Sequence, residues 1–314
     1  MTPDAPPALD VLALGEPLAE FNQTSPGEPS YLQGFGGDTS NFAIAAARQG
    51  ARSGYLSAVG DDHYGRAFLD LWRAEGVDAS GVSIDRDAPT GLYVVTHDRG
   101  GHHFTFYRAG SAASRMTPAS LVPDRIAAAR LLHLSGISFA ISTSACDACY
   151  AAIAAAKAAG TLVSFDTNLR LKLWGRDRAR AVILDALGLC DIALPSLDDV
   201  AVLTGISDPD RLADLALSRG AKAVALKLGR GGALLADAGE RHRIPPYPVA
   251  ALDATGAGDT FGGAFVARRL VGDDLLAAGR YAAVAAALST TGYGAVGPIP
   301  RREAVEAALA GWEG

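Results

Sequence analysis

The chain has few cysteines, no long apolar stretch and no cluster of basic residues. Its 314 residues contain only three cysteines, and an odd, small number of cysteines does not make a disulfide framework. No stretch approaches the roughly 18 consecutive apolar residues of a membrane-spanning helix, and the first apolar run, residues 9–14, is too short for the hydrophobic region of a signal peptide. Lys and Arg are scattered and the net charge is −6, so we expect neither nucleic acid nor a membrane as partner. These features predict a cytoplasmic protein.

Two common nucleotide-binding motifs are also missing. No Gly-x-x-x-x-Gly-Lys-Ser/Thr loop occurs, and no Gly-x-Gly-x-x-Gly follows the first apolar run, which argues against a dinucleotide oxidoreductase. The one Cys-x-x-Cys, Cys146 and Cys149, lies in a helix-like stretch without a second cysteine pair or a nearby histidine. We expect these two cysteines to pack in the core rather than to bind zinc.

What the chain does have is an ordinary globular composition, 49% hydrophobic and 20% charged, with short apolar runs that alternate with longer amphipathic ones. This alternation predicts an α/β fold with a mostly parallel central sheet and helices on both faces. Ligands of such sheets bind beyond the carboxyl ends of the strands. The strand-like runs are 10–14, 55–59, 130–134, 162–166, 192–194, 224–228 and 233–236. The helix-like runs are 40–49, 65–75, 143–159, 179–188, 197–203, 210–218, 257–270, 275–290 and 302–310.

Two segments depart from this alternation. Residues 91–107 alternate like paired strands around a turn at 98–101, and residues 16–35 are non-helical with a Pro/Gly-rich loop. We expect roughly 16–36 and 91–108 to form a small antiparallel β lid on a single domain that spans 1–314. Such a lid would exclude water from a reacting phosphate. Its exposed strand edge predicts a homo-oligomer that forms through the lid.

The most informative stretch is residues 253–260, which read Asp-Ala-Thr-Gly-Ala-Gly-Asp-Thr. Gly256, Ala257 and Gly258 at a helix start would present several N–H groups to an anion. Asp259 then lies in the first turn, where the helix dipole should lower the pKa of its carboxyl. An anion cradle beside a fixed carboxylate suits phosphoryl transfer. The alternative from the residues alone is a tight turn followed by a capping aspartate.

A second motif lies in the N-terminal part of the chain. Residues 36–45 read Gly-Gly-Asp-Thr-Ser-Asn-Phe-Ala-Ile-Ala, and 59–65 read Val-Gly-Asp-Asp-His-Tyr-Gly. Together with 253–259, they resemble the ribokinase-like (PfkB-type) carbohydrate kinases over nearly the whole chain. The resemblance implies an α/β sandwich with a β-sheet lid and transfer of the ATP γ-phosphate to a sugar alcohol with Mg²⁺. Asp259 would accept the proton of the primary hydroxyl, and Gly256, Ala257 and Gly258 would form the anion hole.

Four further stretches, 14–18, 90–93, 106–112 and 165–174, resemble the 2-keto-3-deoxygluconate kinases within this family. Their expected reaction phosphorylates the sugar acid to its 6-phosphate. Arg108 and Arg170 fit this resemblance, because the planar guanidinium suits a carboxylate that neutral sugars lack. The alternative for each arginine is a surface or salt-bridge role.

The resemblance also implies the remaining site residues. For the substrate these are Gly37, Asp38, Asn41, Tyr93 and Phe106, with Arg108, Arg170 and Asp259. For ATP they are Asn168, Ser196, Lys227, Gly229 and Gly232, with Gly256 and Gly258, and for Mg²⁺ the residue is Asp199.

The chain also departs from the family pattern. The Asn-x-x-Glu of many members reads Ser196-Leu-Asp-Asp199 here, and an Asn near the adenine is Ala283. Glu20 replaces an Asp of neutral-sugar kinases, and Phe106 replaces a Tyr. Alternatives are a kinase of fructose or 2-keto-3-deoxygalactonate and, from another class, a non-catalytic sugar or nucleotide sensor on the same fold.

Overall fold

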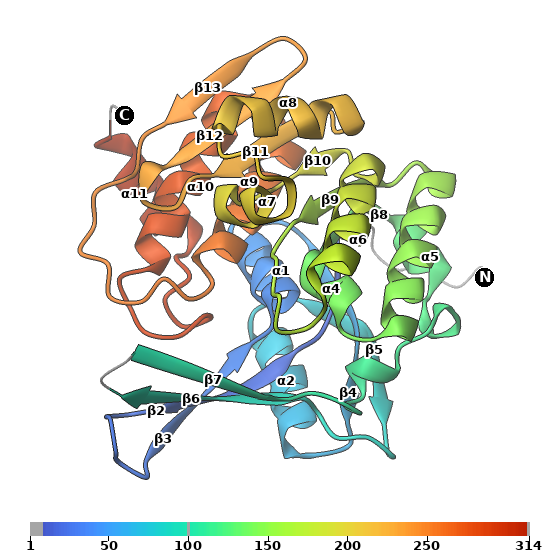
Figure 1. Ribbon diagram of the computed structural model, residues 1–314. Helices are drawn as coiled ribbons and strands as arrows, with labels where there is room; N and C mark the ends of the chain where they lie inside the picture. Colours follow the sequence, from blue (N-terminus) through green and yellow to red (C-terminus); the bar gives the residue numbers. More distant parts are fainter. Residues whose placement is uncertain (1–8, 99–100, 313–314) are drawn as a thin grey trace, which may run out of the picture.

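The computed structural model describes residues 9–98 and 101–312 and contains two separate sheets (Figure 1). The large sheet has nine strands in the order β13-β12-β11-β10-β9-β8-β1-β4-β5. Neighbours from β11 to β5 run parallel, whereas β12 and β13 are added antiparallel at one edge. The strands are β1 (Leu9–Leu14), β4 (Ser53–Gly60), β5 (Asp78–Asp85), β8 (Ala129–Ser135), β9 (Leu162–Asp166), β10 (Ile192–Ala193), β11 (Ala223–Lys227), β12 (Ala233–Asp237) and β13 (Arg241–Ile244).

Helices cover both faces of the large sheet, because its central strands are apolar on both sides. Strand β4 is buried along its whole length, and only Asp10 of β1 is not fully buried. One layer consists of α3 (Pro123–Ala128), α4 (Gly136–Ala140), α5 (Thr143–Ala159), α6 (Arg176–Leu189), α7 (Leu197–Thr204) and α8 (Pro209–Arg219). The other consists of α1 (Asp38–Arg48), α2 (His63–Ala74), α9 (Ala257–Val271), α10 (Leu275–Ser289) and α11 (Arg302–Ala310). Short 3₁₀ turns are Ala113–Arg115, Pro118–Ser120 and Gly229–Gly231.

The small sheet has four strands in the order β3-β2-β6-β7 and lies beside the large sheet, below it in Figure 1. It comprises β2 (Leu18–Gln23), β3 (Tyr31–Gly36), β6 (Leu92–Asp98) and β7 (Gly101–Tyr107). The ring centroids of Phe35 and Phe68 lie 5.0 Å apart and pack β3 against α2. The small sheet is therefore attached to the body by aromatic packing as well as by chain connections.

The α/β architecture and the position of the small sheet confirm the expectations from sequence. The expectation of a purely antiparallel small sheet is wrong in one respect: β2–β3 and β6–β7 are antiparallel, but the central pair β2–β6 is parallel. Both hairpins leave the large sheet at the carboxyl ends of its strands, β1 and β5, and so enter the small sheet in the same direction. The expected turn at 98–101 includes residues 99 and 100, which lie outside the described ranges.

Two strands of the large sheet were not expected from the sequence. Strand β5 reads Asp-Ala-Ser-Gly-Val-Ser-Ile-Asp and is only partly buried, and β13 has four residues, two of them arginine. Both are edge strands, which carry charged and small residues more often than central strands do. Cys146 and Cys149 are buried free thiols on α5, as expected.

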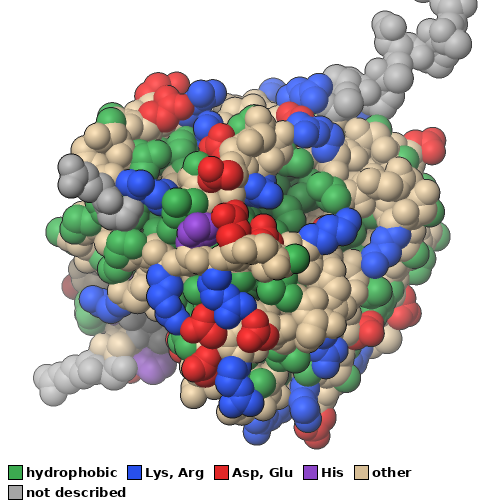
Figure 2. All heavy atoms as spheres, turned by 90° about the horizontal axis from the view of Figure 1, so that it is seen from above, with side chains coloured by type: hydrophobic (Ala, Val, Ile, Leu, Met, Phe, Trp, Pro, Cys, Tyr) green, Lys and Arg blue, Asp and Glu red, His purple; other side chains and the backbone are tan. Residues whose placement is uncertain are grey.

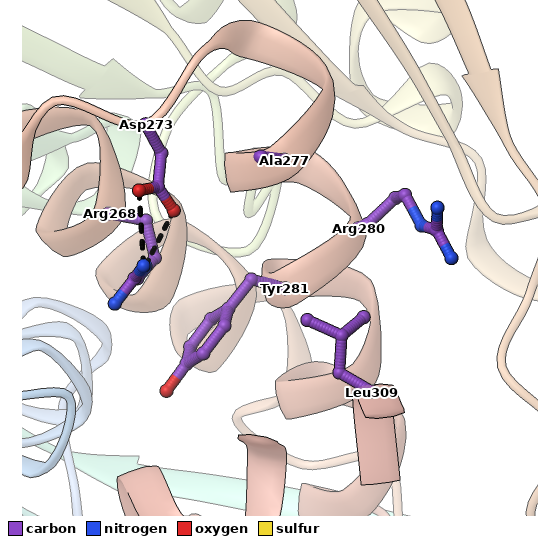
Figure 3. A pocket seen from close by; sticks show the side chains of 6 residues that line it. All are labelled: Arg268, Asp273, Ala277, Arg280, Tyr281 and Leu309. Carbon is purple, nitrogen blue, oxygen red and sulfur yellow. Dashed lines mark hydrogen bonds and ion pairs between the residues drawn. The ribbon is translucent and has the colours of Figure 1, made fainter. Parts of the chain in front are cut away.

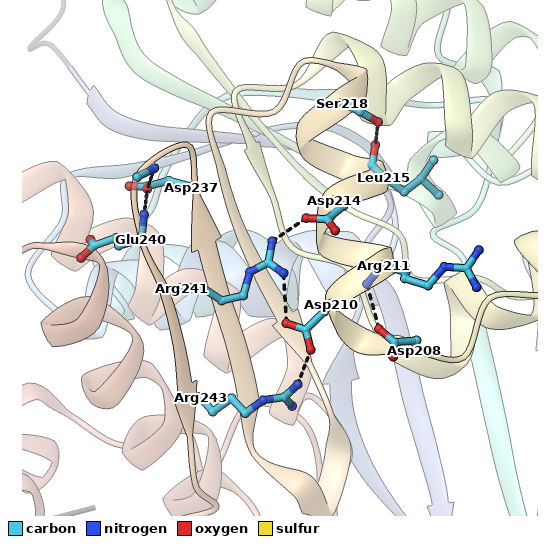
Figure 4. A network of polar contacts seen from close by, with 11 residues as sticks. Asp208, Asp210, Arg211, Asp214, Leu215, Ser218, Asp237, Glu240, Arg241 and Arg243 are labelled. Atoms are coloured by element: carbon cyan, nitrogen blue, oxygen red, sulfur yellow. Dashed lines mark hydrogen bonds and ion pairs between the residues drawn. The ribbon is translucent and has the colours of Figure 1, made fainter.

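The short edge strand β13 is tied to helix α8 by charge. Arg241 contacts Asp210 at 3.0 Å and Asp214 at 2.5 Å, and Arg243 also contacts Asp210 (Figure 4). These side chains are all at least one-third exposed, so each pair contributes less than about 1 kcal/mol.

Charges of both signs are mixed over the surface of the molecule. On the face seen in Figure 2, acidic and basic side chains lie next to one another with apolar side chains between them. Among the described residues, no helix has the length and apolar character needed to cross a membrane.

Candidate active site

Polar side chains gather beyond the carboxyl ends of the parallel strands. Glu16 follows β1, Ser135 ends β8, Asp166 ends β9, Ser196 follows β10 and Lys227 ends β11. Helices α1 and α9 begin at the same edge, because Asn41 of α1 contacts Asp259 of α9. The topology therefore places the two expected motifs, which are more than 200 residues apart in the chain, side by side.

Helix α9 begins at the glycine-rich stretch. Gly256 caps the helix with φ 75°, a left-handed conformation that favours glycine. The N–H of Ala257 donates to Ala254 O at 3.2 Å. Within the described chain, the N–H groups of Gly258 and Asp259 have no hydrogen-bond partner in the protein. These donors lie at the positive end of the helix dipole, at the position where the sequence predicts an anion cradle.

The loop before the cradle is braced by Asp253. One of its carboxylate oxygens accepts from the N–H and the hydroxyl of Thr255 at 2.9 and 2.6 Å, and the other accepts from Gly294 N at 2.9 Å. A Cβ on Gly256 would come within 3.0 Å of Ala295 O. The 290s loop therefore packs directly against the cradle and leaves no room for a side chain at Gly256.

Two more glycines bring α1 and α9 close enough for Asn41 to reach Asp259. A Cβ on Gly263 would lie 2.6 Å from Phe42 O, and a Cβ on Gly262 would lie 3.2 Å from the Phe42 ring. Asn41 Nδ2 donates to Asp259 Oδ2 at 2.8 Å. This bond orients the Asp259 carboxylate. It comes from Asn41, which we had expected from the sequence to contact the substrate.

The expectation that Asp259 has a lowered pKa is wrong. Burial, and after it the nearby charge of Asp38, raise the pKa of Asp259 to about 7. The hydrogen bond from Asn41 and the charge of Lys227 act in the opposite direction. Desolvation and a second carboxylate therefore outweigh the helix dipole. A carboxylate with a pKa near neutrality is well matched to general-base catalysis.

Asp38, the second carboxylate, is held by the loop after β9. Asn168 Nδ2 donates to Asp38 Oδ2 at 2.7 Å. Burial raises the pKa of Asp38, and Ser135 and Arg170 lower it. Asn168 has φ 24°, which is strained for a residue with a side chain, and its N–H donates to Asp166 Oδ1. Asn168, expected on the ATP side, thus contacts the expected sugar-side residue Asp38.

On the expected nucleotide side, Lys227 forms a buried ion pair with Asp166. A Cβ on Gly258 would lie 3.5 Å from Lys227 Nζ, so the ammonium borders the anion cradle. Ser196 lies beside Lys227 through a parallel bridge, and its N–H donates to Thr167 Oγ1 at 3.2 Å. A phosphate in the cradle would meet the Lys227 charge.

Asp199, the expected Mg²⁺ ligand, lies in the first turn of α7. Its Oδ2 accepts from Leu169 N at 3.1 Å, and burial raises its pKa. The described residues contain no group of three or more side chains arranged to hold a metal ion. The carboxylate oxygens of Asp199 and Asp166 are of the kind that Mg²⁺ prefers, and Mg²⁺ is commonly held by one or two carboxylates together with water and substrate phosphates.

The glycines of the β11–β12 hairpin form a tight turn. Gly229 and Gly232 have φ 56° and 86°, and a Cβ on Gly232 would lie 2.0 Å from Ile244 O. The hairpin follows Lys227 directly, so it lies at the same edge as the ion pair.

The two arginines expected to bind a carboxylate differ in exposure. Arg170 is exposed, donates to Leu169 O at 2.8 Å and lowers the pKa of both Asp38 and Asp199. Its charge therefore lies near these two carboxylates. Arg108 is mostly buried and ion-paired with Glu16.

The small sheet contributes a polar pair and an aromatic cluster. Tyr93 donates from its hydroxyl to Glu20 Oε2 at 2.8 Å, and both residues are buried. Burial and the Glu20 charge raise the pKa of Tyr93, as do the charges of Asp253 and Asp259, which therefore lie near it. Phe106, partly exposed, has its ring centroid 5.7 Å from that of Tyr93.

Gly37, expected to let the backbone approach a sugar, caps α1 with φ 105°. A Cβ there would lie 2.3 Å from Glu16 O, so the close approach in the structure is to the chain itself.

Two surface hollows of the described chain lie elsewhere. One, of about 470 Å³, is lined by residues of α9, α10 and α11, with Arg268 paired to Asp273 (Figure 3). Arg268 follows Asp259 by nine positions in α9, which is about 14 Å along the helix axis. Another, of about 410 Å³, lies on α6 and Arg219. Neither contains an expected site residue.

Two charged residues of the site were not assigned from the sequence. Asp166 pairs with Lys227, and Glu16 pairs with Arg108. Each directly ends or follows a strand of the parallel sheet, the position at which other site residues were expected. Their position at the carboxyl end of a parallel strand was the feature of the sequence that could have identified them as site residues.

The fold, the cradle and the acid beside it define a phosphotransferase that acts on sugars. The chain belongs to the pfkB family of carbohydrate kinases, which it matches over residues 8–302.

Individual relatives share this fold and sequence pattern. A 2-dehydro-3-deoxygluconokinase of Thermoproteus tenax is 38% identical over 85% of this chain and 83% of that protein. Fructokinase-1 of Oryza sativa subsp. japonica is 35% identical over 92% of this chain and 94% of that protein. Among solved structures, an E. coli protein described as a ribokinase II, in complex with ATP and Mg²⁺, superposes with a TM-score of 0.89 at 30% identity, covering 96% of this chain and 99% of that one.

Proposed function

We propose that this kinase transfers the γ-phosphoryl group of ATP to the primary hydroxyl of 2-keto-3-deoxygluconate (2-dehydro-3-deoxygluconate) and forms the 6-phosphate. The observation that carries the proposal is Asp259 at the start of α9, with a pKa near 7 beside two unpartnered N–H groups. The similarity to the T. tenax 2-dehydro-3-deoxygluconokinase supports the choice of sugar acid.

The ATP side of the proposed site is the cradle with Lys227. Gly256, Ala257 and Gly258 place N–H groups where negative charge develops during transfer. Lys227 borders the cradle and adds positive charge. The residues expected further out are Asn168, Ser196, Gly229 and Gly232. Asp199 would hold Mg²⁺, which neutralises phosphate charge when bound.

Asp259 takes the proton of the attacking hydroxyl. Asn41 fixes one of its oxygens, which leaves the other to accept a hydrogen bond. With a pKa near 7, Asp259 is largely ionised above neutral pH and accepts a proton more readily than an ordinary aspartate does.

The sugar side comprises Gly37, Asp38, Tyr93 and Phe106. The carboxylate of the sugar acid contacts Arg170, whose charge already acts on Asp38 and Asp199, and the free donors of Arg108. A bidentate guanidinium contact distinguishes a sugar acid from a neutral sugar.

The experiment is an ADP-release assay with ATP, Mg²⁺ and a panel of 2-keto-3-deoxygluconate, 2-keto-3-deoxygalactonate, gluconate, fructose, ribose and adenosine. We expect turnover on the 2-keto-3-deoxy acids and at least about 100-fold lower kcat/KM on fructose, since a site built around a charged contact rejects ligands that lack it. Turnover on fructose alone would support a fructokinase, which the 35% identity to the rice enzyme makes the second candidate. A folded protein that turns over none of the panel would favour a sensor.

We also propose that residues 1–314 form one kinase domain whose lid is the small sheet, at roughly 16–36 and 91–108. The three free thiols fit a reducing compartment, which supports a cytoplasmic location.

The outer strands of the small sheet expose apolar side chains, Tyr31 and Leu32 on β3 and Phe104 and Tyr107 on β7. We propose that a second copy of the chain covers them. Sedimentation of Leu32→Glu as a monomer and of the wild type as a larger species would support this.

A further inference from the structure

Glu16 lies where the small sheet joins the large one. It stands between the end of β1 at Leu14 and the start of β2 at Leu18, and it is only 2% exposed. One carboxylate oxygen, Oε1, accepts from Ser111 Oγ at 3.1 Å, and the other, Oε2, is ion-paired with Arg108 Nη2. Arg108 immediately follows β7, so this buried pair joins two of the connections between the sheets.

The other two connections also touch Glu16. A Cβ on Gly37, between β3 and α1, would lie 2.3 Å from Glu16 O. A Cβ on Gly91, just before β6, would lie 3.3 Å from Glu16 Oε1 and 3.5 Å from Ser111 Cβ. All four connections between the two sheets therefore meet at Glu16. Gly37 approaches its main-chain carbonyl, and the other two connections approach its carboxylate.

Glu16 lies close enough to Asp38 of the candidate site to be affected by its charge. The pKa of Glu16 is raised to about 7, mainly by burial and in part by the charge of Asp38, although Arg108 and Ser111 lower it. In the described chain, the Arg108 guanidinium contacts no acceptor other than Glu16. A guanidinium has five N–H donors, so most of the Arg108 donors have no partner within the described chain.

We infer that Glu16 is a positioning residue for the sugar-acid carboxylate: its buried ion pair orients the Arg108 guanidinium, with Ser111 holding Glu16 in place. The inference rests on the proposed function, because it needs a substrate that carries a carboxylate. Glu16 itself does not touch the substrate. Its effect on binding passes through Arg108.

The test is a double-mutant cycle on KM for 2-keto-3-deoxygluconate with Glu16→Gln, Arg108→Ala and the double variant. Glu16→Gln keeps the shape and removes the charge. We expect it to raise this KM at least about tenfold, since a hydrogen bond to a charged group contributes about 1.5–3 kcal/mol and 1.4 kcal/mol is tenfold. The KM for ATP and kcat should stay within about twofold. In the Arg108→Ala background, Glu16→Gln should have no further effect.

Asp10→Asn is the matched control. Asp10 is also a carboxylate paired with arginine, Arg52 at 3.0 Å, but it lies at the opposite end of strand β1. Its replacement should leave both KM values unchanged. Should Glu16→Gln fail to fold, Ser111→Ala removes the hydrogen bond to Oε1 together with a 3.3 Å bond that Ser111 Oγ accepts from Ser114 N. It should raise KM for the sugar acid a few-fold in the wild-type background alone.

The outcomes separate the inference from the proposed function. A wild-type enzyme that ignores all sugar acids overturns both. A wild type that phosphorylates the sugar acid, with Glu16→Gln effects of equal size in both backgrounds, overturns only the positioning role. A lower KM in Glu16→Gln also overturns it, because Glu16 would then compete with the substrate for Arg108.

Discussion

Two parts of the site hold their charged groups in different ways. One is the start of helix α9 around Asp259, which we call the floor of the site, and the other is the small sheet. In the floor, α9 begins at a glycine in a left-handed conformation, and main-chain N–H groups form the cradle around Asp259. In the small sheet, the charged groups are side chains paired with side chains, Glu16 with Arg108 and Glu20 with Tyr93. A main-chain cradle changes little with side-chain substitution, whereas paired side chains can be exchanged one at a time. We therefore expect the floor to govern turnover and the small sheet to govern the choice of sugar.

The largest expected effect tests the floor. Asp259→Asn should lower kcat by about 10²–10⁴-fold, the usual contribution of a general base, while the sugar acid still binds. Steady-state kinetics and calorimetric binding measure the two quantities. A variant that turns over at the wild-type rate would remove Asp259 from the role of base.

The second prediction concerns the stability of the floor. Lys227→Ala leaves the Asp166 carboxylate buried without its partner, so we expect the free energy of unfolding to fall by about 3–5 kcal/mol, measured in urea. Lys222→Ala breaks a similar lysine–aspartate pair, at 2.8 Å, in which the lysine side chain is 74% exposed. The control should lower the free energy of unfolding much less, because solvent screens an exposed ion pair. Equal losses in the two variants would mean that burial of the Lys227 pair is unimportant.

The third prediction sharpens the comparison between floor and sugar side. Arg170→Ala should raise KM for a sugar acid about 30-fold, because a desolvated charge pair typically contributes 2 kcal/mol or more. The KM for ATP, and kcat/KM for a neutral sugar, should change about threefold at most. Equal losses for acid and neutral substrates would make Arg170 a structural residue.

The fourth prediction uses pH. The raised pKa of Asp259, about 7, means that its carboxylate is protonated progressively as pH falls below 7. The base acts only when ionised, so kcat/KM should fall about tenfold per pH unit below that value and level off above it. Because Asp38 is close enough to affect this titration, the break belongs to the pair. A break near pH 4 would contradict the raised pKa.

The smallest expected effect lies far from both regions. Arg243→Ala removes one exposed contact to Asp210 on α8, so the free energy of unfolding should change by less than about 1 kcal/mol and the kinetics should not change. A larger loss, measured by urea unfolding, would show that the edge strand β13 depends on this network.

Much of the floor could be predicted from the sequence. The α/β alternation, the start of α9 and the glycine at its cap follow from local patterns, and helices α5 and α11 have the expected bounds. The pKa of Asp259 could not be predicted in this way, because the shift comes from burial and from Asp38, 221 positions earlier in the chain. From neighbouring residues alone, only the effect of the helix dipole on this pKa can be expected. Burial and the charge of Asp38 have larger effects on it, and both depend on the tertiary structure.

The sugar side was harder to predict. Arg108 and Arg170 were both expected to face a carboxylate, yet Arg108 is paired with Glu16 and Arg170 is exposed. The order β3-β2-β6-β7 brings Glu16 and Arg108 together across 92 positions of the chain. No spacing in the sequence reports such a contact.

By itself, the sequence determined the fold class, the family and the glycine-rich start of α9, because periodicity, glycine and helix-start chemistry act over a few neighbouring residues. Only the tertiary structure decided which charges meet. Asp38 and Asn41 come to Asp259, Lys227 pairs with Asp166, and Glu16 pairs with Arg108. Electrostatic interactions and desolvation depend on distance and burial in space, and these are set by how strands and helices pack.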